Sequence, residues 1–164
     1  MAHIKRILVP SDGSPPSLAA LCEAAMLAEE LGGSIDVLEV QGPDRFEVGS
    51  ALSVSAGTHE RAQRDLEQAI EAVKRTLGDR VTRRTERGDP LRTIIAAAAG
   101  YDLVVMGTHG RIGRLHSLLG SVAEGVVRNA PCPVLTVREP AGEAESFAER
   151  RHGRSSIATE SSRR

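Results

Sequence analysis

A spaced glycine pattern is the part of this sequence best suited to chemistry. Gly107 and Gly110 stand three residues apart, and Gly120-Ser121 follows after nine further residues. A single glycine more often only makes a turn. Together, however, glycines let a backbone approach a ligand closely, and the N–H groups at the start of a helix favour an anion. The whole pattern therefore predicts a cradle for a polyphosphate.

Several familiar catalytic motifs are absent from the sequence. There is no Gly-x4-Gly-Lys-Ser/Thr, no Gly-x-Gly-x2-Gly after the first strand, no Gly-x-Ser-x-Gly and no His-Glu-x2-His. These motifs mark P-loop nucleotidases, dinucleotide enzymes, α/β-hydrolases and zinc proteases. Nothing supplies a phosphate-binding lysine, a water-positioning base or a dedicated metal cage, so we expect at most slow hydrolysis.

Other polar residues allow two interpretations each. Asp12 could bind a ribose hydroxyl or a Mg²⁺ ion on the phosphates, or it could only stabilise a turn. Arg111 and Arg114 could neutralise phosphate charge or stay solvated, as most charged side chains do. His109 and His116 have no Cys, Asp or Glu at ligand spacing, so we expect no metal or catalytic role for them.

Strand and helix patterns alternate along the chain. Strands are predicted at 4–10, 34–40, 80–87, 102–106 and 134–137, with helices at 15–31, 58–77, 90–99 and 121–129 and a loop at 41–57. Ser14 and Asp89 stand where helix caps are expected, and Gly32 stands where a helix should end. The polar strand 80–87 should be an edge and the apolar strand 102–106 central. This alternation predicts an α/β fold with a parallel sheet and helices on both faces.

Length and composition indicate one globular domain. The chain has 164 residues, is 40% hydrophobic and carries a formal net charge of -1. We expect a domain over residues 1–138 and a disordered tail over 139–164. An aromatic content of 2% and the near-zero charge argue against nucleic-acid partners. The sequence has no membrane span or export signal, so we expect a cytoplasmic protein with Cys22 and Cys132 as free thiols.

Four segments carry a resemblance to a known family. They are 9–14 (VPSDGS), 104–110 (VVMGTHG), 119–122 (LGSV) and 130–137 (APCPVLTV). Over residues 3–138 the chain resembles the nucleotide-binding branch of the universal stress protein family. That resemblance implies ATP bound on a five-stranded parallel sheet of order 3-2-1-4-5, and a homodimer.

The resemblance also assigns the site. In an open α/β sheet, ligands bind at the carboxyl ends of strands where the strand order reverses. Pro10, Ser11 and Asp12 should line the nucleoside, Val40 should touch adenine, Met106 and Gly107 should border the ribose and base, and Gly110, Gly120, Ser121 and Val122 should hold the phosphates. Arg111 joins these candidates on the strength of its own charge. Glu39 stands where the family often has His, and strand alternation should turn it away from the face of Val40. With no aromatic partner available, the base should lie against aliphatic walls.

Three functions remain open at this point. The first is an ATP-binding regulatory protein of the stress response, with Mg²⁺ on the phosphates. The second is a nucleotide-independent interaction protein that dimerises through the last strand, Val134–Val137, because apolar edge strands invite pairing. The third is a slow ATPase, which predicts phosphate release that depends on Asp12.

Overall fold

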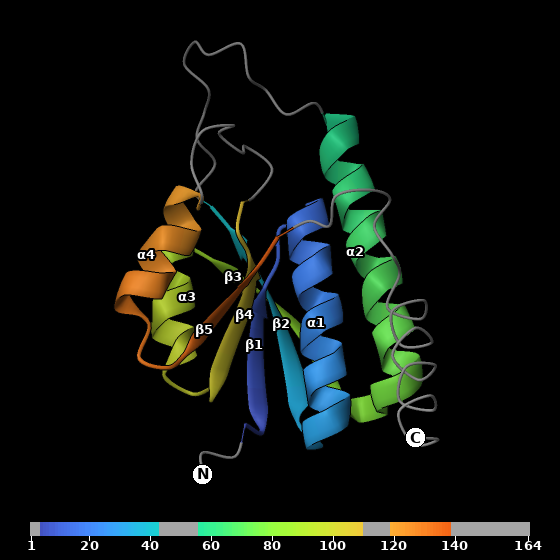
Figure 1. Cartoon of the computed structure of the whole chain (residues 1–164). Helices are drawn as coiled ribbons and strands as arrows, with labels where there is room; N and C mark the ends of the chain where they lie inside the picture. Colours follow the sequence, from blue (N-terminus) through green and yellow to red (C-terminus); the bar gives the residue numbers. More distant parts are fainter. Residues whose placement is uncertain (1–3, 43–55, 110–118, 139–164) are drawn as a thin grey trace, which may run out of the picture.

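The computed structural model describes residues 4–42, 56–109 and 119–138. Its strands are β1 (Arg6–Pro10), β2 (Ser34–Gln41), β3 (Val81–Arg87), β4 (Leu103–Gly107) and β5 (Val134–Val137). Its helices are α1 (Pro15–Leu31), α2 (Ala56–Leu77), α3 (Pro90–Ala98) and α4 (Ser121–Asn129), with a 3₁₀ turn at Gly78–Arg80. The strands form one sheet in the order β3-β2-β1-β4-β5 (Figure 1), and neighbouring strands are parallel. The expected α/β fold and strand order are confirmed.

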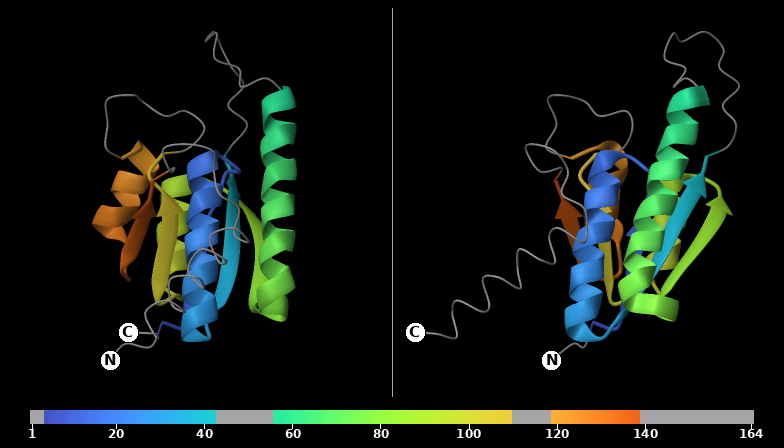
Figure 2. Two further views of the ribbon diagram at one scale, coloured as in Figure 1. Left: turned by 45° about the vertical axis from the view of Figure 1, so that its right-hand side comes forward. Right: turned by 90° about the vertical axis from the view of Figure 1, so that its right-hand side faces the viewer.

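Two helices cover each face of the sheet (Figures 1 and 2). Val9, Val37 and Val105 pack with α1 and α2 in one apolar cluster. Leu8 and Val104, one position before Val9 and Val105, pack with α3 and α4 in the other cluster. Because side chains alternate along a strand, β1 and β4 need consecutive apolar residues, as in Ile7–Val9 and Leu103–Met106, to fill both clusters.

Local sequence signals set most helix ends. Gly32 ends α1 with φ +65°, a left-handed conformation that glycine adopts without strain. The Asp89 side chain accepts the N–H of Arg92 at 3.0 Å and caps α3 as expected. Ser14 occupies the cap position of α1, but its side chain makes no capping bond. Its hydroxyl donates instead to Asp12 Oδ1 and so stabilises the loop before α1.

A few boundaries differ from the sequence-based expectations. Gln41 belongs to β2, while Ala56 and Gly57 begin α2, so the expected loop 41–57 is shorter at both ends. β4 lies inside the sheet, but β1 occupies its centre. The expected tail, 139–164, and the rest of that loop lie outside the described residues. None of the helices in the described ranges is long and apolar enough to span a membrane.

The amino end of the sheet is held by side chains that bind the backbone. The Asp102 carboxylate accepts the N–H groups of Lys5 and Arg6, both at 2.8 Å. These two bonds hold the pKa of Asp102 below its ordinary value. Lys5 Nζ donates to the Leu31 carbonyl at 2.9 Å, at the carboxyl end of α1. The start of β1 is thereby fixed to the segment before β4 and to the end of α1.

Candidate functional site

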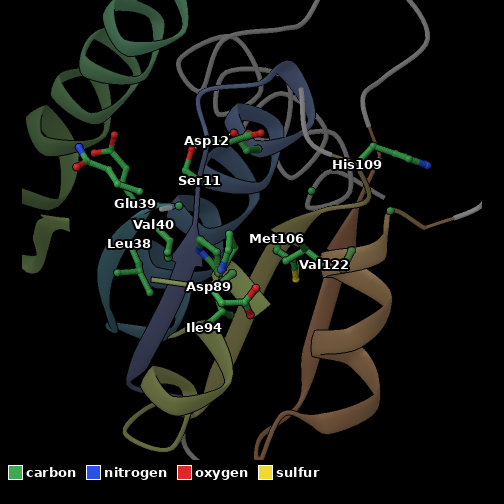
Figure 3. Close-up of a pocket in the computed structure, with 18 of the residues that line it drawn as sticks. Ser11, Asp12, Leu38, Glu39, Val40, Asp89, Ile94, Met106, His109 and Val122 are labelled. Atoms are coloured by element: carbon green, nitrogen blue, oxygen red, sulfur yellow. Dashed lines mark hydrogen bonds between the residues drawn. The ribbon is translucent and has the colours of Figure 1, made fainter. Parts of the chain in front are cut away.

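A pocket of about 1020 Å³ opens at the carboxyl end of the sheet, beside β1 and β4 (Figure 3). Its volume is at the upper end of the range for small-molecule sites, roughly 300–1,000 Å³. β1 is followed by α1 on one face of the sheet, and its neighbour β4 is followed by α4 on the other face. The strand order therefore reverses between β1 and β4. The structure brings together nine of the expected site residues around it: Pro10, Ser11, Asp12, Val40, Met106, Gly107, Gly120, Ser121 and Val122.

The other expected phosphate ligands cannot be placed. Gly110 and Arg111 lie outside the described residues, as do Arg114 and His116. His109 lines the pocket, and its Nδ1 lies 3.2 Å from the Thr108 hydroxyl. A role for Gly110, Arg111 and Arg114 toward phosphate stays a prediction.

The turn after β1 is held by hydrogen bonds within it and to β2 and α1. The Ser11 N–H donates to the Leu38 carbonyl at 2.9 Å, and its hydroxyl lies 2.9 Å from that of Ser17. Asp12 Oδ1 accepts both the N–H and the hydroxyl of Ser14, at 3.0 and 2.5 Å. The turn-stabilising interpretation of Asp12 therefore holds for this oxygen. Among the described residues, no group of three His, Cys, Asp or Glu side chains could hold a metal ion by itself.

Gly107 is required by packing within the chain. A Cβ atom on it would lie 2.8 Å from the carbonyl carbon of Pro16 and 2.9 Å from the nitrogen of Ser17. The close approach that we expected toward a ligand is thus made to the first turn of α1. A Cβ atom on Gly120 would meet its nearest neighbour, the Thr108 oxygen, at 3.4 Å, which is an ordinary contact. Alanine therefore fits at 120 and does not fit at 107.

The start of α4 presents backbone donors to the pocket. The Gly120 N–H donates to the Thr108 carbonyl at 2.7 Å, and the Glu124 N–H donates to the Gly120 carbonyl at 2.9 Å. The N–H groups of Ser121, Val122 and Ala123 precede that first helical bond and have no acceptor within the helix. All three residues line the pocket. These donors and the helix dipole favour an anion at this place.

Apolar side chains also line the pocket. They come from four elements and are Leu38, Val40, Ile94, Met106 and Val122.

Pairing between β1 and β2 ends with Pro10 opposite Leu38, so no β1 residue stands opposite Val40. The Leu38 carbonyl faces β1, where it accepts from Ser11. Backbone groups alternate in direction along a strand, so the Val40 N–H and C=O also face that side, where the pocket lies.

Some lining residues were not expected from the sequence. Asp89 was interpreted only as a helix cap, although it follows β3 and so lies at the same edge of the sheet as the other strand ends. Its position directly after a strand could have indicated a place in the site, because ligands bind at the carboxyl ends of strands. His59 and Gln63 reach the pocket from α2, and no local pattern could have shown where α2 packs.

Two further expectations concern Glu39 and the cysteines. Glu39 is buried and faces α2, on the opposite face of the sheet from Val40, as alternation predicted (Figure 3). Cys22 and Cys132 are not joined in a disulfide. Burial raises the pKa of the Cys132 thiol, and the residue packs against the apolar cluster of α3 and α4. Cys132 therefore behaves as a small packed residue.

Solved structures share this fold. Universal stress protein UspA from Lactobacillus plantarum matches with a TM-score of 0.69 and 26% identity, over 84% of this chain and 100% of that one. A universal stress protein solved with cAMP matches with a TM-score of 0.63 and 24% identity, over 85% of this chain and 100% of that one. One from Archaeoglobus fulgidus, solved with dAMP, matches with a TM-score of 0.52 and 19% identity, over 84% and 99%. The last two likenesses establish the fold alone.

Sequence relatives lead to the same family. A universal stress protein of Methanocaldococcus jannaschii is 34% identical over 142 residues, covering 83% of each chain. Another from Thermus aquaticus is 36% identical over 137 residues, covering 82% of this chain and 98% of the relative. The family model named "Universal stress protein family" matches residues 3–138. The resemblance seen in the sequence is thus confirmed, and this chain belongs to the universal stress protein family.

Proposed function

We propose that the pocket binds an adenine nucleotide, ATP in the first place, and that the chain is a regulatory protein of the stress response. The observation that carries this proposal is the arrangement of the pocket. Apolar walls suited to a base and the N-terminus of α4, suited to phosphates, line the same cavity. The family members solved with cAMP and dAMP agree with this class of ligand.

The backbone of Val40 supports adenine as the base. Its N–H is a donor and its C=O an acceptor, and both face the pocket. On its Watson–Crick edge adenine offers the complement, an acceptor at N1 and a donor at N6, whereas guanine offers a donor at N1 and an acceptor at O6. The same two backbone groups that pair with adenine would therefore leave guanine with unmatched polar atoms, which is costly in a dehydrated site.

We propose that occupancy, and not rapid turnover, is the signal. The sequence contains none of the motifs that supply a phosphate-binding lysine. Asp12 would hold Mg²⁺ on the phosphates through the carboxylate that also binds Ser14. Slow hydrolysis is consistent with such a site, and Asp12→Ala would remove any phosphate release that depends on the ion.

Calorimetry with ATP, ADP, AMP and GTP tests this proposal, with and without Mg²⁺. We expect adenine nucleotides to bind more tightly than GTP, and Mg²⁺ to strengthen ATP binding in the wild type but not in Asp12→Asn. Mass spectrometry of protein purified without added nucleotide should find a bound adenine nucleotide. The proposal is wrong if ATP, ADP and AMP all fail to bind at millimolar concentration.

A second candidate function is pairing through β5. β5 is an edge strand of the sheet, and Leu135 on it is 39% exposed. An apolar edge strand is a template for pairing with another chain, so we propose a homodimer that forms with or without nucleotide. Gly120→Val should abolish nucleotide binding and leave the dimer intact, whereas Leu135→Lys should do the reverse. Light scattering and calorimetry on both variants separate the two functions.

A further inference from the structure

Glu39 is a buried carboxylate on the opposite face of β2 from Val40, and with Gln63 it also lines the pocket. Glu39 precedes Val40 on β2 and is only 7% exposed. Both of its oxygens accept hydrogen bonds: Arg83 Nε donates to Oε1 at 2.5 Å, and Gln63 Nε2 donates to Oε2 at 3.0 Å. Figure 3 shows the Glu39 side chain directed toward α2. The carboxylate therefore joins β2 to both β3 and α2.

Gln63 and Arg83 also bind each other, which closes a ring of three side chains. Arg83 Nη2 donates to Gln63 Oε1 at 3.0 Å. The hydrogen bond that Arg83 donates to Glu39 raises the pKa of Arg83, so the guanidinium stays charged. Withdrawing the hydrogen-bond donors from a buried carboxylate costs much free energy. The Glu39–Gln63–Arg83 ring thus resists any movement that would separate β2 from β3 or from α2.

The position of this ring departs from the pattern of its strand. Ile35 and Val37 point to the same face as Glu39 and are 1% and 0% exposed, packed in the apolar cluster with α1 and α2. An apolar residue at 39 would continue that cluster. The ionised residue appears instead where β1 has ended and β2 is paired on one side only, with Glu39 opposite Thr85 and Val40 opposite Glu86. A restraint from a second direction is needed there if Val40 is to stay in place.

We propose that the Glu39–Gln63–Arg83 ring positions the backbone of Val40 for base recognition and thereby sets the preference of the pocket for adenine over guanine. This inference rests on the proposed nucleotide site. Glu39 is a positioning residue, because its two oxygens are engaged by Arg83 and Gln63 and it acts through the strand. The discrimination depends on two backbone groups whose placement the ring controls, so loosening the ring affects the distinction between bases more than the binding of phosphates.

The test compares the GTP-to-ATP ratio of dissociation constants, measured by calorimetry. Glu39→Ala should lower this ratio by about tenfold, the effect of one to two well-placed hydrogen bonds. Glu39→Gln keeps an oxygen for Arg83 and should retain most of the preference. The matched control is Glu67→Ala, because Glu67 also lies beside Arg83, at 3.5 Å, but is 59% exposed. It should leave the ratio unchanged.

A second variant and a second measurement keep the test decisive. Gln63→Leu removes the bond to α2 with little change in volume, so it carries the test if Glu39→Ala does not fold. In the protein without nucleotide, the Gly88 amide reports on the end of β2, because it donates to the Gln41 carbonyl at 2.9 Å. Its hydrogen exchange should be faster in Glu39→Ala and Gln63→Leu than in Glu67→Ala.

The outcomes separate the ring from the nucleotide site. If the wild type binds no nucleotide, the proposed function fails, while the Gly88 exchange still reports whether the ring holds β2. If the wild type prefers ATP and Glu39→Ala or Gln63→Leu keeps the same ratio, the ring has no part in base recognition. Equal affinities of the wild type for ATP and GTP would also overturn the inference.

Discussion

The two ends of the sheet use polar groups in opposite ways. At the amino end, side chains bind the backbone: Asp102 accepts from Lys5 and Arg6, and Arg80 Nη1 donates to the carbonyls of Ala28 and Gly33 at 3.1 and 2.9 Å. At the carboxyl end, backbone donors of α4 and the side of β2 near Val40 face a pocket. The first end is closed by its own residues, and the second leaves groups for a ligand.

This difference follows from the direction of a parallel sheet. The helices that follow the strands begin at the carboxyl end, where their partial positive charge and unpaired N–H groups suit an anion. They finish at the amino end, where their last carbonyls need donors. Lys5 and Arg80 supply such donors to α1, through Leu31 and Ala28. Cations thus complete the end of α1 on one side. On the other side Asp89 caps α3, whereas α4 begins at Gly120 with no side-chain cap and leaves its donors for an anion from outside.

The largest expected effect is a difference in stability between alanine variants of two glycines at the pocket end. Gly107→Ala should destabilise the protein by about 1–3 kcal/mol, because its Cβ would overlap the start of α1. Gly120→Ala should change stability by less than about 0.5 kcal/mol, as surface substitutions usually do. Urea unfolding measures both. Equal losses would mean that the carboxyl end is not divided into a packed part and a ligand-facing part.

The next effect concerns the amino end. Asp102→Ala should lower the melting temperature and leave nucleotide affinity unchanged. The pKa of Asp102 is lower in the folded chain than its ordinary value of 3.8, so its contribution is present above that value and is lost as the pH falls through the folded value. Circular dichroism during acid titration should show the wild type and the variant converging at low pH. A change in nucleotide affinity would break the separation between the two ends.

The smallest effect is expected at the first residue of α4. Ser121→Ala should weaken ATP binding by roughly three- to tenfold, the effect of one hydrogen bond, with stability nearly unchanged. The control on the same helix is Arg128→Ala. Within the described part of the chain, Arg128 forms an ion pair with Glu124 and does not line the pocket. Its affinity for ATP should equal that of the wild type. If both variants weaken binding alike, general helix stability would explain the effect.

Much of the fold could be predicted because its signals are local or periodic. The alternation of apolar residues located the strands, Gly32 and Asp89 marked helix ends, and the order of strands and helices implied the parallel sheet. Nine site residues that line the pocket were assigned through the family resemblance, and all of them but Val40 lie in the segments that carry it. Only the folded chain shows that Gly107 also packs tightly against Pro16, far away in the sequence, while its expected approach to a ligand stays a prediction.

The sequence by itself determined which segments become strands and helices, and which face of each is apolar, because side-chain periodicity, helix hydrogen bonds and helix caps involve near neighbours in the chain. Only the tertiary structure decided which side chains meet across elements. Glu39 binds Gln63, 24 positions away, and Arg83, 44 positions away. Such contacts depend on how β3 pairs with β2 and where α2 settles on the sheet. No pattern within one segment contains that information, so the ring behind Val40 could be found only in the folded protein.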